Sequence, residues 1–508
     1  MRSTIQWLEK NRSGKKLELY KAFLEPKERA LYDYLVGESS LKVADVSQVI
    51  FGGSYKAFRE AKDNLEDGFA DLVITTSRSI SKQKQNNKLF FFSYKMMIAL
   101  RFLSAQSAIR WEDRNHIKKL ADIFSKHGLV LPALEILRVY RMKLLNGDRN
   151  LKEVKTVSVT IDSLLSSFLA FYRFEFFYQK IALYIKSWNI NIKSTLNEIN
   201  NCSRDVLDTL NNTPNVFLMT LYYGVLGLKA LIERDYRIAI VTIEEGISRV
   251  NSSRVKNLGG VALFFQVGLV AAIKLGNRSL SLSVLHKTDS QILKTDAKTT
   301  KSQLFPLMIK LCLRLGLHEQ GITYLRRLVH TKGDSRVNNF ASEDYPILSA
   351  YFYFLYKIGK LDGLDVPTEF KRDRYRLGKF MNDVPIFSKD KAGTNISILI
   401  AQAIILLVEK RYEEFSKRVK ALETYRYRHL NKNDMLQRGK VFIKMLELIP
   451  RADFHRERVV WRSRELRKQL DIPPEKMSIR NSDIEVIPYE HLWEYIVDLL
   501  DNKLVKSV

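Results

Sequence analysis

The chain has 508 residues, of which 46% are apolar and 27% are charged, a composition typical of a globular protein and not of a disordered one. Its 22 glycines and 11 prolines are few, which favours long helices with short connections and argues against a many-stranded sheet fold. The 83 Lys and Arg residues exceed the 56 Asp and Glu residues by 27, an excess that suits association with nucleic acid, ribosomes or anionic surfaces, or that reflects a generally basic proteome.

The two cysteines, Cys202 and Cys312, are too few for a disulfide framework, and neither has a cysteine or histidine neighbour at metal-ligand spacing. We therefore expect two buried thiols in a reducing compartment, and no metal or other cofactor.

The most apolar windows, 261–273 and 396–408, are shorter than the about 20 residues that a membrane-spanning helix requires. The first residues lack an apolar stretch of secretory-signal length. These features predict a cytoplasmic protein without membrane insertion.

Residues 1–75 are predicted to form a small helical cap. The segments 26–37, 43–51 and 54–74 have helical patterns, and two glycines separate the last two segments. Three helices joined in this way are also compatible with a DNA-binding helix-turn-helix, whose third helix would carry basic residues to phosphates. The third helix also carries acidic residues, which would repel DNA and therefore favour the cap. The residues concerned are the basic Lys56, Arg59 and Lys62 and the acidic Glu60, Asp63, Glu66, Asp67 and Asp71.

The next segment, 76–94, is polar and basic, and is predicted to be a loop.

The clearest helical pattern lies in residues 221–250, where two apolar faces flank a polar turn at 233–235. Small residues on both faces would let two antiparallel helices approach closely while large residues fill the gaps. The pattern resembles a helical hairpin of the tetratricopeptide type, with its Leu-Gly pair in the first helix and small residues in the second. The first face consists of Tyr223, Leu226, Gly227 and Ala230, and the second of Tyr236, Ala239, Ile243 and Gly246.

Similar polar interruptions recur about 40 residues apart, in KLGNRS, RLGLHEQ and KIGKLDG, and each contains a glycine where a helix would end. Another interruption, VEKRYEE, follows a longer gap that contains the basic stretch 371–391. The segment 125–145 has the same helix–break–helix pattern. We interpret the chain as all-α, with an irregular α-solenoid of tetratricopeptide-like helical hairpins over residues 95–470. A compact α-helical domain without a superhelix is the alternative.

The C-terminal region begins with YRYRHL and ends with DIEVIPYEHLWEYIVDLL. Over about 80 residues it resembles the C-terminal end of an uncharacterised family of bacterial cytoplasmic tetratricopeptide-like helical-repeat proteins. The matching pieces are 425–430, 442–446, 453–456 and 487–493. The resemblance implies a helical-repeat fold, and a tetratricopeptide-like fold implies partner binding along a concave face. It implies no particular activity or partner.

Residues 471–508 are predicted to contain an extended segment followed by a capping helix. Pro488 would begin this helix, and its apolar stripe would close the stack of repeats. We expect Trp493, which lies in the stripe, to be part of the core. The stripe consists of Leu492, Trp493, Ile496, Leu499 and Leu500.

The stretch 410–468 is strongly basic, with 18 Lys and Arg residues against 8 Asp and Glu residues. Tyr425 and Tyr427 stand about 200° apart on a helix, so they do not form one stacking platform with the arginines. Three interpretations are open: a solvated basic face, a contact with nucleic acid or ribosomes, and a contact with an acidic protein partner. The candidate binding surface consists of Arg426, Arg428, Lys440, Lys444, Arg458, Arg462, Arg464, Arg467 and Lys468.

No constellation of catalytic residues is found in the sequence. The segment RSGKKLE, residues 12–18, lacks the first glycine and the Ser or Thr of a phosphate-binding loop, and the eight histidines do not pair at metal-ligand spacing. We therefore predict a non-enzymatic helical-repeat scaffold that binds a protein or peptide partner. The alternative is a nucleic-acid- or ribosome-associated protein that uses the basic C-terminal surface.

Overall fold

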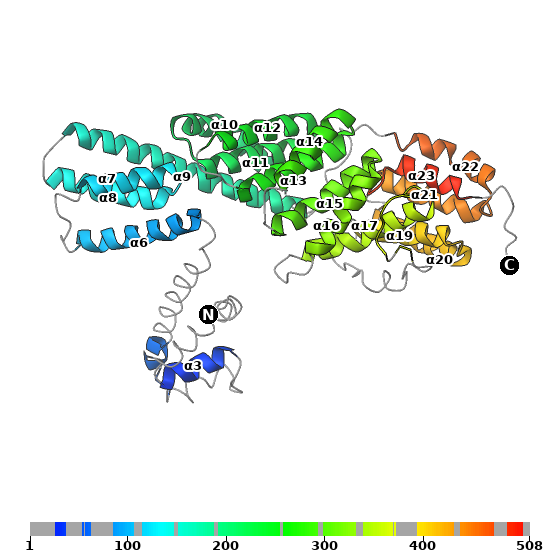
Figure 1. Cartoon of the computed structure of the whole chain (residues 1–508), viewed down its shortest axis with the longest axis horizontal. Helices are drawn as coiled ribbons and strands as arrows, with labels where there is room; N and C mark the ends of the chain where they lie inside the picture. The colour runs from blue at the N-terminus through cyan, green and yellow to red at the C-terminus, as the bar shows by residue number, and fades with distance from the viewer. Residues whose placement is uncertain are drawn as a thin grey trace. The chain divides into compact units, whose positions relative to one another are not determined.

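The computed structural model describes most of the chain, and every regular element in this part is a helix (Figure 1). The described residues are 26–36, 53–54, 56–61, 85–105, 114–146, 151–186, 191–253, 258–292, 298–331, 339–368, 370–371, 394–430, 437–471 and 485–500. The predicted all-α fold class is confirmed for these residues. The chain divides into two compact units, Met1–Leu165 and Ser166–Val508. Their boundary falls inside the long helix α9 (Leu151–Lys186), within the region predicted as one solenoid.

The first unit contains the N-terminal helices of the described part of the chain. Helix α3 agrees with the predicted helix 26–37, and residues 56–61 are helical within the predicted third helix. The predicted helix 43–51 lies outside the described residues. The predicted loop 76–94 is wrong for residues 85–94, because α6 already begins at Gln85. The helices are α3 (Pro26–Val36), α6 (Gln85–Ala105), α7 (Arg114–Lys126), α8 (Val130–Asn146) and the first part of α9.

Helices α7 and α8 form the hairpin that the pattern of residues 125–145 predicted. Gly128 ends α7 with a φ of +71°, a conformation that favours glycine. The Gly128 amide donates to the carbonyl of Ser125 and the Leu129 amide to that of Phe124, both at 2.9 Å. These two hydrogen bonds satisfy carbonyls that the end of a helix leaves without intrahelical partners. The chain then turns directly into α8, which also packs against α6.

The second unit contains the remaining helices, which pack mostly against their neighbours in the sequence. Helices α11, α13, α15, α17 and α19 also contact one another in that order, so they form a second series of contacts along the unit. Figure 1 shows α11, α13, α15 and α17 following one another in this order. The helices are α10 (Lys193–Asn212), α11 (Val216–Ile232), α12 (Tyr236–Ser252), α13 (Leu258–Leu275), α14 (Arg278–Ile292), α15 (Lys298–Leu315), α16 (His318–Thr331), α17 (Asn339–Lys357), α19 (Thr394–Val408), α20 (Tyr412–Tyr425), the π-helical η3 (Arg426–Leu430), α21 (Gln437–Arg451), α22 (Arg456–Lys468) and α23 (Tyr489–Asp498).

Glycines end three of these helices, as the recurring interruptions predicted. Gly276, Gly316 and Gly359 have φ values of +66°, +72° and +75°. Arg234 and Lys410 adopt the same left-handed conformation without being glycine, at +67° and +57°. In each of these two breaks, the following residue donates a 2.9 Å hydrogen bond to a carbonyl five residues earlier. The turn geometry is therefore shared by breaks with and without glycine.

The predicted hairpin 221–250 is confirmed as α11 and α12. Glycines bring the two helices close, because a Cβ on Gly227 would lie 2.6 Å from Ile243 Cδ1 and one on Gly246 would lie 2.7 Å from Tyr223 Cβ. Asp235 caps the N-terminus of α12 by accepting a hydrogen bond from the Ile238 amide at 3.1 Å. The sequence thus specifies both the turn and the close packing of this pair.

The apolar windows 261–273 and 396–408 lie in α13 and α19, where most of their side chains are buried, so their assignment to core helices is confirmed. Both cysteines are also buried free thiols, as predicted. Burial raises the pKa of the Cys312 thiol to about 12, so that it stays protonated and unreactive near neutral pH.

Helix α9 differs from these core helices. Within the described residues, its stretch Leu151–Ile185 is the one helix that is long and apolar enough to cross a membrane, by length and composition alone. This stretch is not one of the two apolar windows found in the sequence, and charged residues such as Asp162, Arg173 and Glu175 interrupt its apolar pattern. Only a small part of this stretch is buried.

Candidate partner-binding surface

The residues that were assigned to a binding surface lie on η3, α21 and α22, and α23 packs beside them. Helix α21 is the buried centre of this region, with Phe442, Ile443 and Leu446 fully enclosed. The ring of Phe442 stacks on Tyr489 of α23 with 4.2 Å between centroids and meets Trp493 edge-on at 6.4 Å. The predicted inward stripe of the last helix and the core position of Trp493 are therefore confirmed. This packing fixes α23 against α21.

Arg438, which the sequence analysis did not single out, is buried at the start of α21 and holds three segments together. Its guanidinium donates to both carboxylate oxygens of Glu485 at 2.6 and 3.0 Å, to Glu490 at 2.6 Å, and to the carbonyl of Leu470. Burial alone would raise the pKa of Glu485, but the hydrogen bonds and the charge of Arg438 outweigh it and lower that pKa. Glu485 is therefore held as a carboxylate in the interior, beside a permanently charged arginine.

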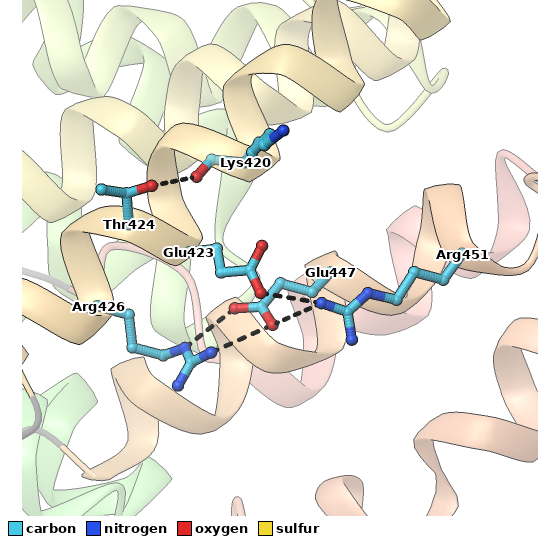
Figure 2. A network of polar contacts seen from close by, with 6 residues as sticks. All are labelled: Lys420, Glu423, Thr424, Arg426, Glu447 and Arg451. Carbon is cyan, nitrogen blue, oxygen red and sulfur yellow. Dashed lines mark hydrogen bonds and ion pairs between the residues drawn. The ribbon is translucent and has the colours of Figure 1, made fainter.

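Arg426 forms a second buried ion pair, which Figure 2 shows. Its guanidinium donates to the two carboxylate oxygens of Glu447 at 3.0 and 3.3 Å, and both side chains are almost fully enclosed. Arg451 extends the network to Glu423 at 2.9 Å and to Glu447 at 3.7 Å. Arg426 therefore does not belong to an exposed binding surface, and neither does Lys440, which is also buried. The sequence-based assignment is wrong for these two residues.

The five basic candidates on α22 are exposed, but each contacts a group of its own chain. Arg467 pairs with Glu494 of α23 at 2.5 Å, and Lys468 pairs with Glu465 at 3.1 Å. Arg462 donates to the carbonyl of Arg451 at 2.7 Å and so caps the C-terminus of α21. The other two contacts are Arg458 with Asp453 at 3.5 Å and Arg464 with Glu465 at 3.7 Å.

Arg456, which was not a candidate, pairs with Asp498 of α23 at 2.8 Å. Together with the pair of Arg467 and Glu494, this contact links α22 to α23. A large part of the positive charge of α22 is thus offset by neighbouring carboxylates, which lowers its attraction for phosphates.

Arg428 and Lys444 are the remaining candidates, and both are exposed. Tyr427 lies beside Arg428 and is also exposed, whereas Tyr425 is partly buried against the core. The guanidinium of Arg426 lies over the ring of Tyr427 at 4.4 Å. One of the two tyrosines therefore faces solvent and the other faces the core, as their spacing predicted.

The most exposed large apolar side chain of this region is Trp461 of α22, which retains 66% of its accessible surface, and the adjacent Val460 is also exposed. The guanidinium of Arg464 lies over the indole at 5.4 Å. An open hollow of about 480 Å³ lies beside Trp461, and a second hollow of about 420 Å³ shares three of its lining residues and is also lined by residues of α23. The first is lined by Arg456, Glu457, Val460, Trp461 and Arg464, and the second by Arg456, Val460, Ser463, Arg464, Arg467, Trp493, Glu494, Val497 and Asp498.

The count of charges along α22 does not reveal this apolar site. The helical period carries the missing signal: Val459 and Ser463 are buried one turn apart, so Val460 and Trp461 lie away from that face. Tryptophan and arginine are the residues that most often dominate binding energy at protein interfaces. We refer to the first hollow and its lining residues as the Trp461 hollow.

Among the described residues, no group of three or more His, Cys, Asp or Glu side chains is arranged to hold a metal ion. No protein-family model, curated protein or solved structure matches the chain. The arrangement of side chains in the Trp461 hollow is therefore the principal guide to function.

Proposed function

We propose that the protein is a non-enzymatic helical-repeat scaffold that binds a protein partner at the Trp461 hollow. The observation that carries this proposal is the exposed indole of Trp461, with Arg464 over its face and an open hollow at its edge. A solvated helix gains nothing from exposing tryptophan to water, whereas an interface uses its large apolar area. A partner segment with an apolar side chain next to a carboxylate would satisfy both the indole and the arginine.

The proposal includes an irregular α-solenoid of tetratricopeptide-like hairpins, in a cytoplasmic protein. Its support is the spacing of α11, α13, α15 and α17, which begin at residues 216, 258, 298 and 339, about 40 residues apart. Contacts between successive members of this series provide the stacking that a repeat array requires. Such arrays present long surfaces for other proteins, which agrees with a scaffold role.

The proposal is tested by affinity capture with the tagged full-length protein from its native lysate, in 50 and 300 mM salt and with and without nuclease. The wild-type protein should retain a stoichiometric protein partner under all four conditions. Trp461→Ser should lose that partner by at least tenfold, without loss of stability because the side chain is exposed. Ile238→Ser, which removes an exposed apolar side chain from α12, is the control and should bind like the wild type.

A second function, contact with nucleic acid or ribosomes, is favoured by Tyr427 and Arg428, which are consecutive exposed residues of η3. An aromatic ring next to an arginine can stack on a base while the guanidinium contacts a phosphate. The same capture experiment distinguishes the two functions. Bound material that disappears with nuclease and 300 mM salt, and that depends on Tyr427→Ser with Arg428→Ser but not on Trp461→Ser, would replace the scaffold with this second function.

A further inference from the structure

The second half of α9 is apolar on two opposite faces, but only one face is packed. Within the second unit, Ala170, Phe174, Phe177 and Ile181 are buried, and the ring of Phe174 lies 5.3 Å from that of Tyr222. A helix that is apolar all round is normally covered on all sides. The outer face of α9 therefore lacks a cover in the described residues.

The exposed large apolar residues of the second half of α9 lie in one row. They retain between 49% and 60% of their accessible surface, and Gln179 continues the row between the last two. Their spacing of three, four and seven residues is that of the a and d positions of a heptad, which form the contact seam of a coiled coil. Isolated apolar residues on a surface are ordinary, but a continuous row of this length is not. The row, named here the α9 stripe, consists of Leu169, Tyr172, Phe176 and Leu183.

The charged residues that flank the α9 stripe favour a second copy of the chain, in parallel orientation, as its partner. If Leu169 and Phe176 are a positions, Glu175 is a g position and Lys180 is the e position five residues later. In a parallel pair of helices, a g residue lies beside the e residue five positions further along the partner. A second copy of this chain would thus place its Lys180 beside Glu175. An antiparallel pair would instead bring the e positions together, and these are the positively charged Arg173 and Lys180.

We propose that the protein self-associates by pairing the α9 stripe with the same stripe of a second copy, in parallel. The helix is already folded, so pairing does not need to pay for helix formation, which is the main cost for isolated short helices. Lys180 already lies over the ring of Phe176 at 4.5 Å, at the edge of the stripe where the charge of the partner would lie. The proposal is independent of the Trp461 hollow, because it concerns a different surface of the chain.

Sedimentation equilibrium of the full-length protein between 1 and 100 µM tests the proposal. The wild-type protein should dimerise in this range, and Leu169→Glu combined with Phe176→Glu should raise the dissociation constant at least tenfold. The matched control, Ile238→Glu combined with Val241→Glu, changes two exposed apolar residues of α12 and should leave it unchanged. A wild-type monomer at 100 µM, or a dimer that persists in the α9 variant, would overturn the proposal. Circular dichroism of each variant verifies that the fold is retained.

Two further variants test the parallel alignment. Glu175→Lys should weaken the dimer, and addition of Lys180→Glu to the same chain should restore it, because the exchanged charges face each other again. Leu183→Cys should form an intermolecular disulfide under mild oxidation, since parallel pairing brings the two copies of residue 183 together. In an antiparallel pair they would be more than about 20 Å apart. Failure of both the charge rescue and the cross-link would overturn the parallel pairing.

The composition of α9 is also compatible with binding of the stripe to a membrane surface. Flotation with vesicles of phosphatidylcholine and phosphatidylglycerol distinguishes this binding from pairing with a second copy. Under the proposal, the wild-type protein does not float with these vesicles in physiological salt. Flotation of the wild-type protein that is lost with Leu169→Glu and Phe176→Glu, together with a monomer in solution, would replace the second copy with a lipid surface.

Discussion

The hairpin of α11 and α12 and the region of α21 to α23 are both built from helices of 10 to 17 residues that pack on one another, but different forces position the helices. In the hairpin, Gly227 and Gly246 remove the side chains that would separate the helices, so shape complementarity decides the packing. In the C-terminal region, Arg426 and Arg438 are buried with carboxylates and tie distant segments together. The comparison shows that a basic stretch of sequence does not imply a basic surface, because part of its charge stabilises the interior.

The strongest test of this comparison is removal of the buried guanidinium. Arg438→Met should destabilise the docking of α23 by about 3–5 kcal/mol, since Glu485 is left as an unpaired charge in the interior. Hydrogen exchange of the α23 amides measures this directly, and protection should fall by about two to four orders of magnitude.

Adding Glu485→Met to Arg438→Met should recover much of the loss, because an apolar pair of similar size replaces the ion pair. A loss below about 1 kcal/mol in the single variant would show that the network of Arg438 is not what holds α23.

The same pair predicts an inversion of pH dependence. In the wild type, the pKa of Glu485 is lowered from 4.5, so its stabilising contribution is present above about pH 4.5 and is lost as the pH falls through the lowered pKa. In Arg438→Met, the largest influences that oppose burial are gone. The charge of Arg314 and the hydrogen bond from the Tyr489 amide remain but are weaker, so we expect burial to raise the pKa of Glu485. Its contribution is then present below about pH 4.5 and is lost as the pH rises through the raised pKa.

Urea titrations between pH 3.5 and 7 should therefore give a stability difference between wild type and Arg438→Met that grows with pH. Glu485→Gln provides the control, since it removes the titrating group. A difference that is independent of pH would contradict the assignment of this behaviour to Glu485.

The close packing of α11 and α12 is tested by adding a methyl group at Gly246, where the two helices are in close contact. Gly246→Ala should destabilise the protein by about 1–3 kcal/mol, although alanine is the better helix former, because the new Cβ would lie 2.7 Å from Tyr223 Cβ, which is fixed to the backbone. Gly268→Ala in α13 is the matched control. There the nearest atom, Val284 Cγ1, is 3.5 Å from the new Cβ, so the substitution should stabilise by up to about 1 kcal/mol. Thermal unfolding compares the two variants, and equal signs would contradict the steric argument.

The two regions also differ in how far the sequence predicts them. The faces of α11 and α12 and the breaks at Gly276, Gly316 and Gly359 follow from local spacing, and the structure contains them as predicted. The burial of Arg426 and Arg438 depends on carboxylates 21 and 47 residues away. A local pattern does not contain such partners, so counting charges placed Arg426 on a surface.

The binding site shows the same limit of local patterns. Trp461 was missed, although the period of α22 contains the signal that directs it outwards. The sequence thus predicted the region of the candidate site and five exposed basic residues of α22, but not the apolar centre of the hollow.

The smallest expected effect concerns the exposed ion pair of Arg467 and Glu494, in contrast to the buried network of Arg438. Arg467→Ala removes an ion pair with Glu494 that also links α22 to α23, yet both side chains are about half exposed. Water and salt screen such a pair, so hydrogen exchange of α23 should report a loss below about 1 kcal/mol, which decreases further in 0.5 M salt. A loss above about 2 kcal/mol, insensitive to salt, would mean that the exposed pair is as important as Arg438. The distinction between structural arginines inside and dispensable pairs outside would then fail, and the charge around the hollow between α22 and α23 would be needed for the fold, leaving less of it for a partner.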